Sequence, residues 1–471
     1  MSYWPKRLLK QSIIYGGGDV AGKLLKFLLI PVYTTYLLPS EYGILSLCLL
    51  YAGFAAVFCF WGVNSAFFRY FVPQEKEGDS SDSFGNVFLL VTIFSLLVFS
   101  LSYLFSRSLS TFLLGGASQA YLIRITAASI LVNSPLATLL LLYRAEGKPI
   151  SYVKVTVAKL FLALLCNLYL VVDLRMGVRG VLYSDIISST LTLLFLLIKL
   201  SPYLGLHLSL SLSKKLLKYG VPLVPAVLSG VVIMLSDRYF IELYQGAKAV
   251  GIYSLGYRVG IAVNLAVTAF NFAWSPAIFR IVREKGAKRI FSDVLSHYVA
   301  LVGLILLGLC LFQREIFSLF VNASYHQGLE VVLLIAISYF IYGLYLNFEV
   351  GLYLRDKTPY VTLISLLAAG LNIGLNLLLI PQMGIKGAAW ATLLSYLLMA
   401  GLGLLLSQGQ YRVRYDLRRL ATNFILLSGI YLLSSLFNLL IYRVLLFLLY
   451  LLWVLMAERP LFQGAISFDD E

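Results

Sequence analysis

The chain has 471 residues, of which 60% are hydrophobic and 13% charged, and its mean hydropathy is +0.88. A soluble domain carries about 45–50% apolar and about 25% charged residues, so this composition excludes an ordinary water-soluble protein. The formal net charge of +15 does not indicate nucleic-acid binding, because the chain has no polar domain that could display a basic surface.

The long apolar segments predict an all-α polytopic membrane protein of about fourteen transmembrane helices, since crossing the hydrocarbon takes about 20 residues. In chain order the predicted helices cover residues 11–38, 43–70, 84–105, 119–143, 150–173, 178–200, 217–241, 250–276, 291–312, 329–353, 358–380, 385–407, 418–438 and 441–457. Only Asn438 and Arg443 separate the last two. These last two segments could therefore form either a helical hairpin or one long tilted helix.

The first apolar segment follows the basic stretch Met1 to Lys10 and lacks a small-residue cleavage site. We therefore expect a retained helix rather than a signal peptide. The four cysteines lie in apolar segments and form no Cys-x-x-Cys pair, which favours helix packing over redox or zinc chemistry. No histidine has a second metal ligand nearby, so we expect no metal and no cofactor.

Lysine and arginine are concentrated in alternate loops. Basic clusters occur at residues 6–10, 144–154, 214–218, 280–289 and 412–419, whereas the opposite loops carry isolated cations such as Arg107, Lys248 and Arg314. The positive-inside rule places the basic loops and both termini in the cytoplasm. The sequence thus predicts a multi-pass protein of the cell inner membrane.

The two halves of the sequence resemble each other. Tyr-Gly-Ile-Leu-Ser-Leu at 42–47 matches Val-Gly-Ile-Tyr-Ser-Leu at 250–255, and Met-Gly-Val-Arg-Gly at 176–180 matches Met-Gly-Ile-Lys-Gly at 383–387. Both matches are displaced by about 208 residues, which indicates a duplication. Six predicted helices fill one repeat, so both repeats enter the membrane from the same side, and their interface is expected to enclose a central cavity. The predicted domains are an N-lobe at 1–210, a C-lobe at 211–410, and two additional helices with a cytoplasmic tail at 411–471.

Several motifs resemble those of a known family. They are the glycine cluster at 16–22, Leu-Pro-Ser-Glu-Tyr-Gly at 38–43, Gly-Val-Asn-Ser-Ala at 62–66 followed by Arg69, Ser-Asp-Arg-Tyr-Phe-Ile at 236–241, and the two Met-Gly turns. Together these motifs resemble the polysaccharide-transporter branch, the Wzx-type O-antigen flippases, of the MOP exporter superfamily. The resemblance covers residues 8 to about 410.

The resemblance implies export of an undecaprenyl-diphosphate-linked oligosaccharide from the cytoplasmic to the outer leaflet by alternating access. It also implies a two-lobed fold with a central cationic cavity, with membrane lipids as neighbours. A polysaccharide polymerase or ligase is an open candidate partner.

Charged residues inside predicted spans are candidate site residues, because a charge at the bilayer centre costs at least about 2.5–3.5 kcal/mol. Substrate binding is predicted for five cations that could attract a diphosphate: Lys23, Lys26, Arg69, Lys159 and Arg258. Other interpretations stay open for some of them: a structural pair of Asp19 with Lys23, snorkelling of Lys26, and a cytoplasmic anchor for Arg69.

The intramembrane carboxylates are candidates for ion coupling or gating, with H⁺ or Na⁺ as the coupling ion. They are Asp19, Asp185, Asp237 and Glu349. Because Asp237 stands beside Arg238, an element that positions the lobes is the alternative for that pair.

Other functions remain to be weighed. One alternative is a flippase for another lipid-linked cell-wall precursor of the lipid II type, and another is a MATE-like multidrug or cation antiporter. Such a pump needs acidic groups in its cavity, whereas here the intramembrane cations match or exceed the acids. An enzyme is not expected, because no loop is long enough for a catalytic domain and no nucleotide-binding motif occurs.

Overall fold

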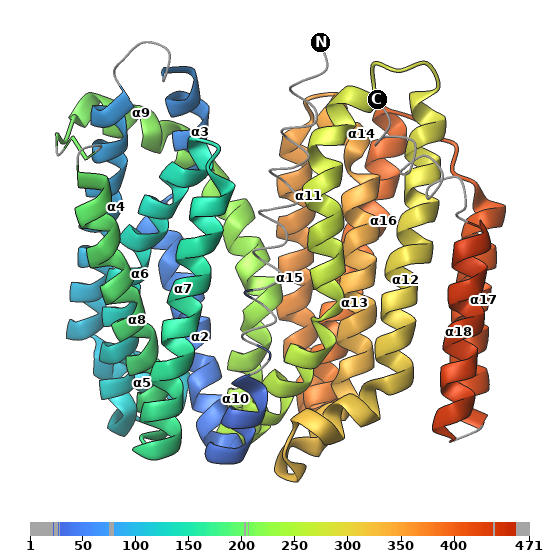
Figure 1. The fold of residues 1–471 in the computed structure, drawn as a ribbon, viewed down its shortest axis with the longest axis horizontal. Coiled ribbons are helices and arrows are strands. Elements are labelled where there is room, and N and C mark those ends of the chain that lie inside the picture. Colours follow the sequence, from blue (N-terminus) through green and yellow to red (C-terminus); the bar gives the residue numbers. More distant parts are fainter. Residues whose placement is uncertain are drawn as a thin grey trace. The chain divides into compact units, whose positions relative to one another are not determined.

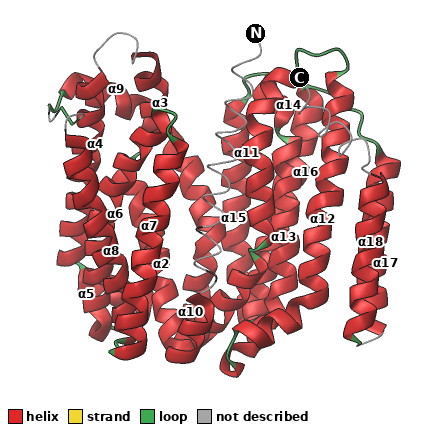
Figure 2. Cartoon of the chain, viewed as in Figure 1, coloured by secondary structure: helices red, strands yellow, loops and turns green. Residues whose placement is uncertain are grey.

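The computed structural model describes residues 22, 27, 29–74, 80–201, 204, 205, 207–436 and 439–457, and these residues form helices joined by short turns (Figure 2). The α-helices are α2 (Pro39–Phe60), α3 (Val63–Gln74), α4 (Ser80–Leu104), α5 (Ser106–Leu114), α6 (Ala120–Ala145), α7 (Pro149–Asn167), α8 (Gly177–Leu200), α9 (Leu210–Gly220), α10 (Val224–Gly260), α11 (Val263–Ile281), α12 (Ala287–Phe320), α13 (Leu329–Phe348), α14 (Val350–Leu354), α15 (Thr358–Met383), α16 (Ile385–Gln410), α17 (Leu417–Leu436) and α18 (Leu440–Ala457). A π-helical turn, Leu168–Asp173, extends α7.

Twelve helical segments of the described residues are long and apolar enough to cross a membrane. One of them, Leu210–Gly260, has 51 residues, more than twice the length of a single crossing. It contains a break at Gly246, whose φ of 78° is not helical. The predicted loop between 241 and 250 is therefore present as a bend. The predicted first helix, 11–38, lies largely outside the described residues, and about fourteen helices is compatible with this count.

Two helices predicted as continuous are interrupted, and these predictions of 43–70 and 250–276 as single helices are wrong. The first breaks at Trp61 and Gly62, which have φ values of 44° and 72°, so α2 ends and α3 begins there. The second breaks after Gly260, where two residues separate the end of α10 from the start of α11. Both breaks lie in apolar sequence, so hydropathy alone does not reveal them.

The last two predicted helices are separate, as α17 and α18. They pack against each other and against α12. Of the two alternatives that the sequence left open, the structure has the pair of helices rather than one long helix.

The chain divides into two compact units. Unit 1 comprises residues 1–255, 321–327 and 365–391, and unit 2 comprises 256–320, 328–364 and 392–471. The predicted lobe boundaries near 210 and 410 stay a prediction.

In unit 1, α6 is the central helix and packs against α2, α4, α5 and α8, while α7 lies along α8 (Figure 1). Buried hydroxyl groups on α6 hydrogen-bond to carbonyls one turn earlier: Thr126 to Leu122, Ser134 to Ile130 and Thr138 to Ser134. A bilayer offers no water to unpaired polar groups, so this local pairing lets α6 carry hydroxyls inside an apolar bundle.

In unit 2, α12 packs against α11, α13, α17 and α18 (Figure 1). Its 34 residues are longer than a perpendicular crossing requires. A cluster of buried side chains joins α12 to the last two helices, with Leu307 and Leu311 meeting Leu427 and Tyr450. The additional C-terminal helices are thus packed onto unit 2 through α12.

The predicted duplication is visible in a reciprocal contact between the matching glycines Gly43 and Gly251, both in unit 1. A Cβ atom built on Gly43 would lie 1.8 Å from the carbonyl oxygen of Ala247, and one on Gly251 would lie 1.8 Å from that of Pro39. Pro39 and Ala247 precede their glycines by the same number of positions, so the two repeats meet through equivalent residues. The second matched pair, Gly177 and Gly384, adopts nearly identical φ values of 58° and 60°.

Candidate functional site

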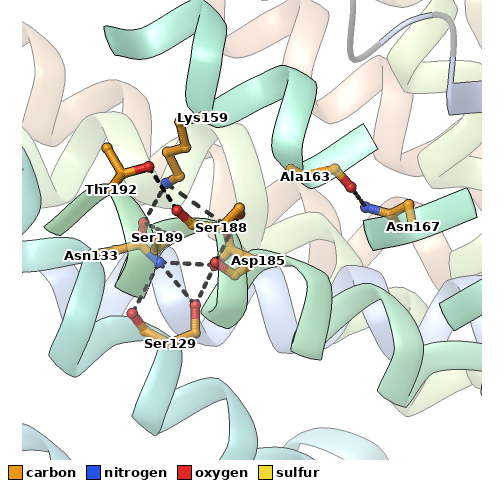
Figure 3. A network of polar contacts seen from close by, with 9 residues as sticks. All are labelled: Ser129, Asn133, Lys159, Ala163, Asn167, Asp185, Ser188, Ser189 and Thr192. Carbon is orange, nitrogen blue, oxygen red and sulfur yellow. Dashed lines mark hydrogen bonds and ion pairs between the residues drawn. The ribbon is translucent and has the colours of Figure 1, made fainter. Parts of the chain in front are cut away.

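A polar network crosses the middle of three membrane helices in unit 1, and it joins the predicted site residues Lys159 and Asp185 (Figure 3). Lys159 on α7 donates a hydrogen bond from Nζ to Oδ1 of Asn133 on α6, at 2.7 Å. Its Nζ also lies 3.9 Å from Oδ1 of Asp185 on α8. Three helices therefore contribute to one group of charges.

Asn133 connects the two charges. Its Nδ2 atom donates to Oδ2 of Asp185 at 2.8 Å, while its Oδ1 atom accepts from both Lys159 and the Ser189 hydroxyl, the latter at 3.0 Å. The Ser129 hydroxyl, one turn earlier on α6, donates to the same oxygen of Asp185. The amide bonds the carboxylate through one end and the ammonium group through the other.

The depth of the network in the membrane explains why Lys159 has polar partners. Lys159 is ten residues into the apolar segment Pro149–Asp173, about 15 Å from its start, where an unpaired ammonium group would be costly. The lysine side chain is 20% exposed and the aspartate side chain 45% exposed. The aspartate side chain is therefore only partly covered by the packed helices.

A second charged group in unit 1 is more buried. Asp237 is fully buried on α10 and accepts a 2.7 Å hydrogen bond from Nη1 of Arg238, while the Tyr253 hydroxyl donates to its other carboxylate oxygen. Sixteen residues of straight helix would separate Asp237 from Tyr253 by about 24 Å, so this contact depends on the bend at Gly246. Both carboxylate oxygens are bonded, which is the geometry of a fixed structural pair.

Two further predicted residues lie in unit 2. Arg258 is half-buried near the end of α10, within its last turn. Glu349, at the turn between α13 and α14, is 6% exposed and has Tyr345 and Tyr353 as polar neighbours.

Arg69 lies on α3 and is exposed, and its guanidinium carbon stands 4.7 Å from the ring centroid of Tyr219 on α9. This cation–π contact holds α3 to α9 and fits the interpretation of Arg69 as an anchor. The predicted site residues Asp19, Lys23 and Lys26 lie outside the described residues.

The sequence reasoning missed Asn133, Ser129 and Ser189. A signal was present, because Ser129 and Asn133 are spaced by one helical turn in a predicted membrane helix, as are Asp185 and Ser189. Such spacing aligns polar groups on one face of each helix. It does not indicate which neighbouring helix that face meets.

Comparison with known proteins agrees with this architecture. The model of the family described as "Polysaccharide biosynthesis protein" matches residues 8–282. No curated protein matches the chain by sequence.

Solved structures of the same fold include the lipid II flippase MurJ in an inward closed conformation, with a TM-score of 0.74 at 14% identity over 96% of this chain and 100% of that chain. An inward-facing multidrug resistance MATE family transporter of the MOP superfamily matches with a TM-score of 0.68 at 14% identity over 82% of this chain and 94% of that one. A MATE transporter of Vibrio cholerae gives 0.61 at 17% identity over 87% and 97%. At these identities the likeness shows a common fold.

Proposed function

Because the chain belongs to the polysaccharide biosynthesis protein family, we propose that it is a flippase carrying an undecaprenyl-diphosphate-linked oligosaccharide across the inner membrane. In this proposal the substrate moves from the cytoplasmic to the outer leaflet, both termini are cytoplasmic, and the protein transports rather than catalyses. The observation that carries the proposal is the partly exposed Lys159–Asn133–Asp185 network in the middle of a membrane span.

Lys159 is the group that would attract the substrate. A lysine ammonium group is a compact point charge with three donors, and it suits a diphosphate between a lipid and a sugar. When a phosphate oxygen replaces Asp185 as the partner of Lys159, Asn133 and Ser129 can keep their hydrogen bonds to the carboxylate. The network therefore can exchange an internal anion for an external one without leaving its amide and hydroxyl groups unpaired.

Asp185 is the group that would couple transport to an ion gradient. Protonation removes its charge and releases Lys159 for the diphosphate, whereas loss of the proton restores the internal pair. Na⁺ could act in place of the proton, because carboxylate, amide and hydroxyl oxygens are suitable ligands for a hard cation. We propose that this switch accompanies rotation of the N-lobe against the C-lobe, in the manner of other transporters built from parallel repeats.

Two alternatives share the fold. A lipid II type flippase would use the same diphosphate chemistry and differ in the sugar, and the MurJ likeness is a likeness of fold. A MATE-like antiporter would use Asp185 as a cation site, with Lys159 as a competitor for it. The two classes predict opposite effects of removing Lys159: loss of transport for a flippase, and retained or increased cation binding for an antiporter.

The test uses a strain from which the gene has been deleted, complemented with wild type, Lys159→Ala, Asp185→Asn, Arg258→Ala, Lys23→Ala or Lys26→Ala. Surface polysaccharide and lipid-linked intermediates retained on the cytoplasmic leaflet are measured together. Lys154→Ala is the matched control, since Lys154 is exposed on the same helix, α7, five residues before Lys159.

We expect Lys159→Ala to lower surface glycan by about tenfold or more, the loss typical of removing one charged hydrogen-bond donor. Intermediates should accumulate on the inner leaflet, and Lys154→Ala should behave as wild type. Unchanged glycan together with new sensitivity to cationic drugs would contradict the flippase and support the antiporter.

A further inference from the structure

A polar cavity of about 620 Å³ opens on unit 2, apart from the charged network in unit 1. Its walls come from two segments far apart in the sequence, the first turns of α12 and the loop that joins α16 to α17. The first segment contributes Lys288 and Arg289, and the second contributes Arg412 and Arg414. Four cations, two from a helix start and two from a loop, therefore line one cavity.

These cations are available to a ligand. Arg289, Arg412 and Arg414 are exposed, and they form no ion pair with any residue that the structure describes. Lys288 has its Nζ atom 5.2 Å from the ring centroid of Tyr411. An unpaired arginine presents a planar fork of donors that matches phosphate oxygens.

The two carboxylates of the cavity have other partners. Asp416 accepts the backbone N–H of Arg419 at 3.0 Å and so caps the first turn of α17. Asp293 lies 3.8 Å from the Arg419 guanidinium. The four cations on the cavity wall outnumber these two acids, so the cavity keeps an excess of positive charge.

The loop that carries Arg412 and Arg414 is held in place. Between them, buried Val413 donates its backbone N–H to Oε1 of Gln408 at 3.0 Å and accepts from Nε2 of the same side chain at 2.9 Å. The backbone N–H of Asp416 donates to the Ser292 hydroxyl at 2.9 Å, which ties the loop to α12. A loop fixed in this way loses little entropy when an anion binds.

We propose that this cavity binds the phosphate headgroup of an anionic membrane lipid. The membrane-spanning helices α12 and α17 both begin at the cavity, which puts it at the level of the headgroups. The positive-inside rule assigns this basic end to the cytoplasmic leaflet, where anionic lipids attract clustered lysine and arginine. The N-terminus of α12 adds a favourable dipole for an anion.

The test measures lipid bound to the full chain, purified in neutral detergent, by native mass spectrometry during titration with phosphatidylglycerol. The test variant is Arg412→Gln/Arg414→Gln. The matched control is Arg283→Gln/Lys285→Gln, which removes the same charge from exposed positions on the neighbouring loop outside the cavity. Phosphatidylcholine and inorganic pyrophosphate are titrated separately, and the thermal midpoint of each protein is recorded.

We expect the test variant to bind phosphatidylglycerol roughly 30-fold more weakly, as two cations near a membrane surface imply, while the control stays within about threefold of wild type. Arg412→Lys/Arg414→Lys should recover part of the affinity because the charge is kept. If the double variant fails to fold, the two single Arg→Gln variants take its place.

Equal weakening in the control pair would overturn the proposal, since the binding would then belong to the basic surface in general. Saturable binding of pyrophosphate with no preference for phosphatidylglycerol over phosphatidylcholine would also overturn it, and would assign the cavity to a soluble anion. None of these readouts depends on transport, so the lipid site can fail while the proposed flippase function stands.

Discussion

Gly43 and Gly251 pack backbone to backbone, and the contact is symmetric. Each glycine faces the carbonyl group that lies four residues before the other glycine. A Cβ on either glycine would lie 1.8 Å from a carbonyl oxygen of the opposite helix, and 3.0 Å from the backbone nitrogen of the other glycine. Such closeness requires glycine on both sides, as at other close helix crossings in membranes. The contact gives the glycine of the shared motif the same structural role in both repeats.

Substitution at this crossing should therefore be destabilising. We expect Gly43→Ala and Gly251→Ala each to cost about 1–3 kcal/mol or more, because the opposing atom belongs to the backbone and cannot move away alone. The thermal midpoint of the purified protein is the measurement.

Gly230→Ala on α10 is the control for this prediction, since nothing lies within 4 Å of its built Cβ. Alanine favours a helix over glycine by about 0.5–1 kcal/mol, so the control should be as stable as wild type or slightly more stable. Equal destabilisation by all three substitutions would show that the crossing has no special role.

The pairing of Lys159 with Asp185 can be tested by a double-mutant cycle on stability. Lys159→Met and Asp185→Asn should each cost about 1 kcal/mol, a modest value because both side chains of the pair are partly exposed. The double variant should lose less than the sum, since neither charge is then left without its partner. Additive losses in the thermal midpoint would mean that the two groups act independently.

The Lys159→Met/Asp185→Asn double variant should remain inactive in transport although its stability recovers. If Lys159 attracts the substrate, the double variant regains stability and still fails to export glycan. A double variant that regains both would reduce the network to a structural role.

Arg443 on α18 is bidentate to Glu315 on α12, with Nη2–Oε1 and Nη1–Oε2 distances of 2.7 and 3.1 Å. We expect Arg443→Ala to cost about 1–3 kcal/mol, and Arg443→Lys to cost less because the charge is kept while the fork is lost. Protease sensitivity of the segment after residue 436, followed alongside the thermal midpoint, would report whether α18 separates from α12. Wild-type resistance in Arg443→Ala would contradict the prediction.

Asp237 is expected to be structural. Asp237→Asn leaves the buried Arg238 guanidinium without its counter-charge, and removal of one partner of a buried pair costs about 3–5 kcal/mol. Tyr253→Phe removes one hydrogen bond from the same carboxylate and should cost about 1 kcal/mol. A stable Asp237→Asn variant that has lost transport would instead assign Asp237 to coupling.

The sequence by itself determined the class of protein, the approximate positions of most membrane-spanning segments and the duplication. Burial of apolar side chains in a bilayer depends on local composition, so a window of about 20 residues carries the signal for each helix. The repeat was likewise readable, because Gly43 and Gly251 stand in matching motifs. The same local reasoning identified Lys159 and Asp185 as costly charges that needed partners.

Only the tertiary structure decided which of those charges meet. Whether Lys159 contacts Asp185 depends on how α6, α7 and α8 are rotated and packed, and side-chain packing between helices leaves no mark on hydropathy. The breaks at Trp61 and after Gly260 escaped prediction for the same reason, because their residues are as apolar as the helices around them. Local composition sets the free energy of placing each residue in the membrane. Contacts between residues distant in sequence decide which partners stabilise the polar ones.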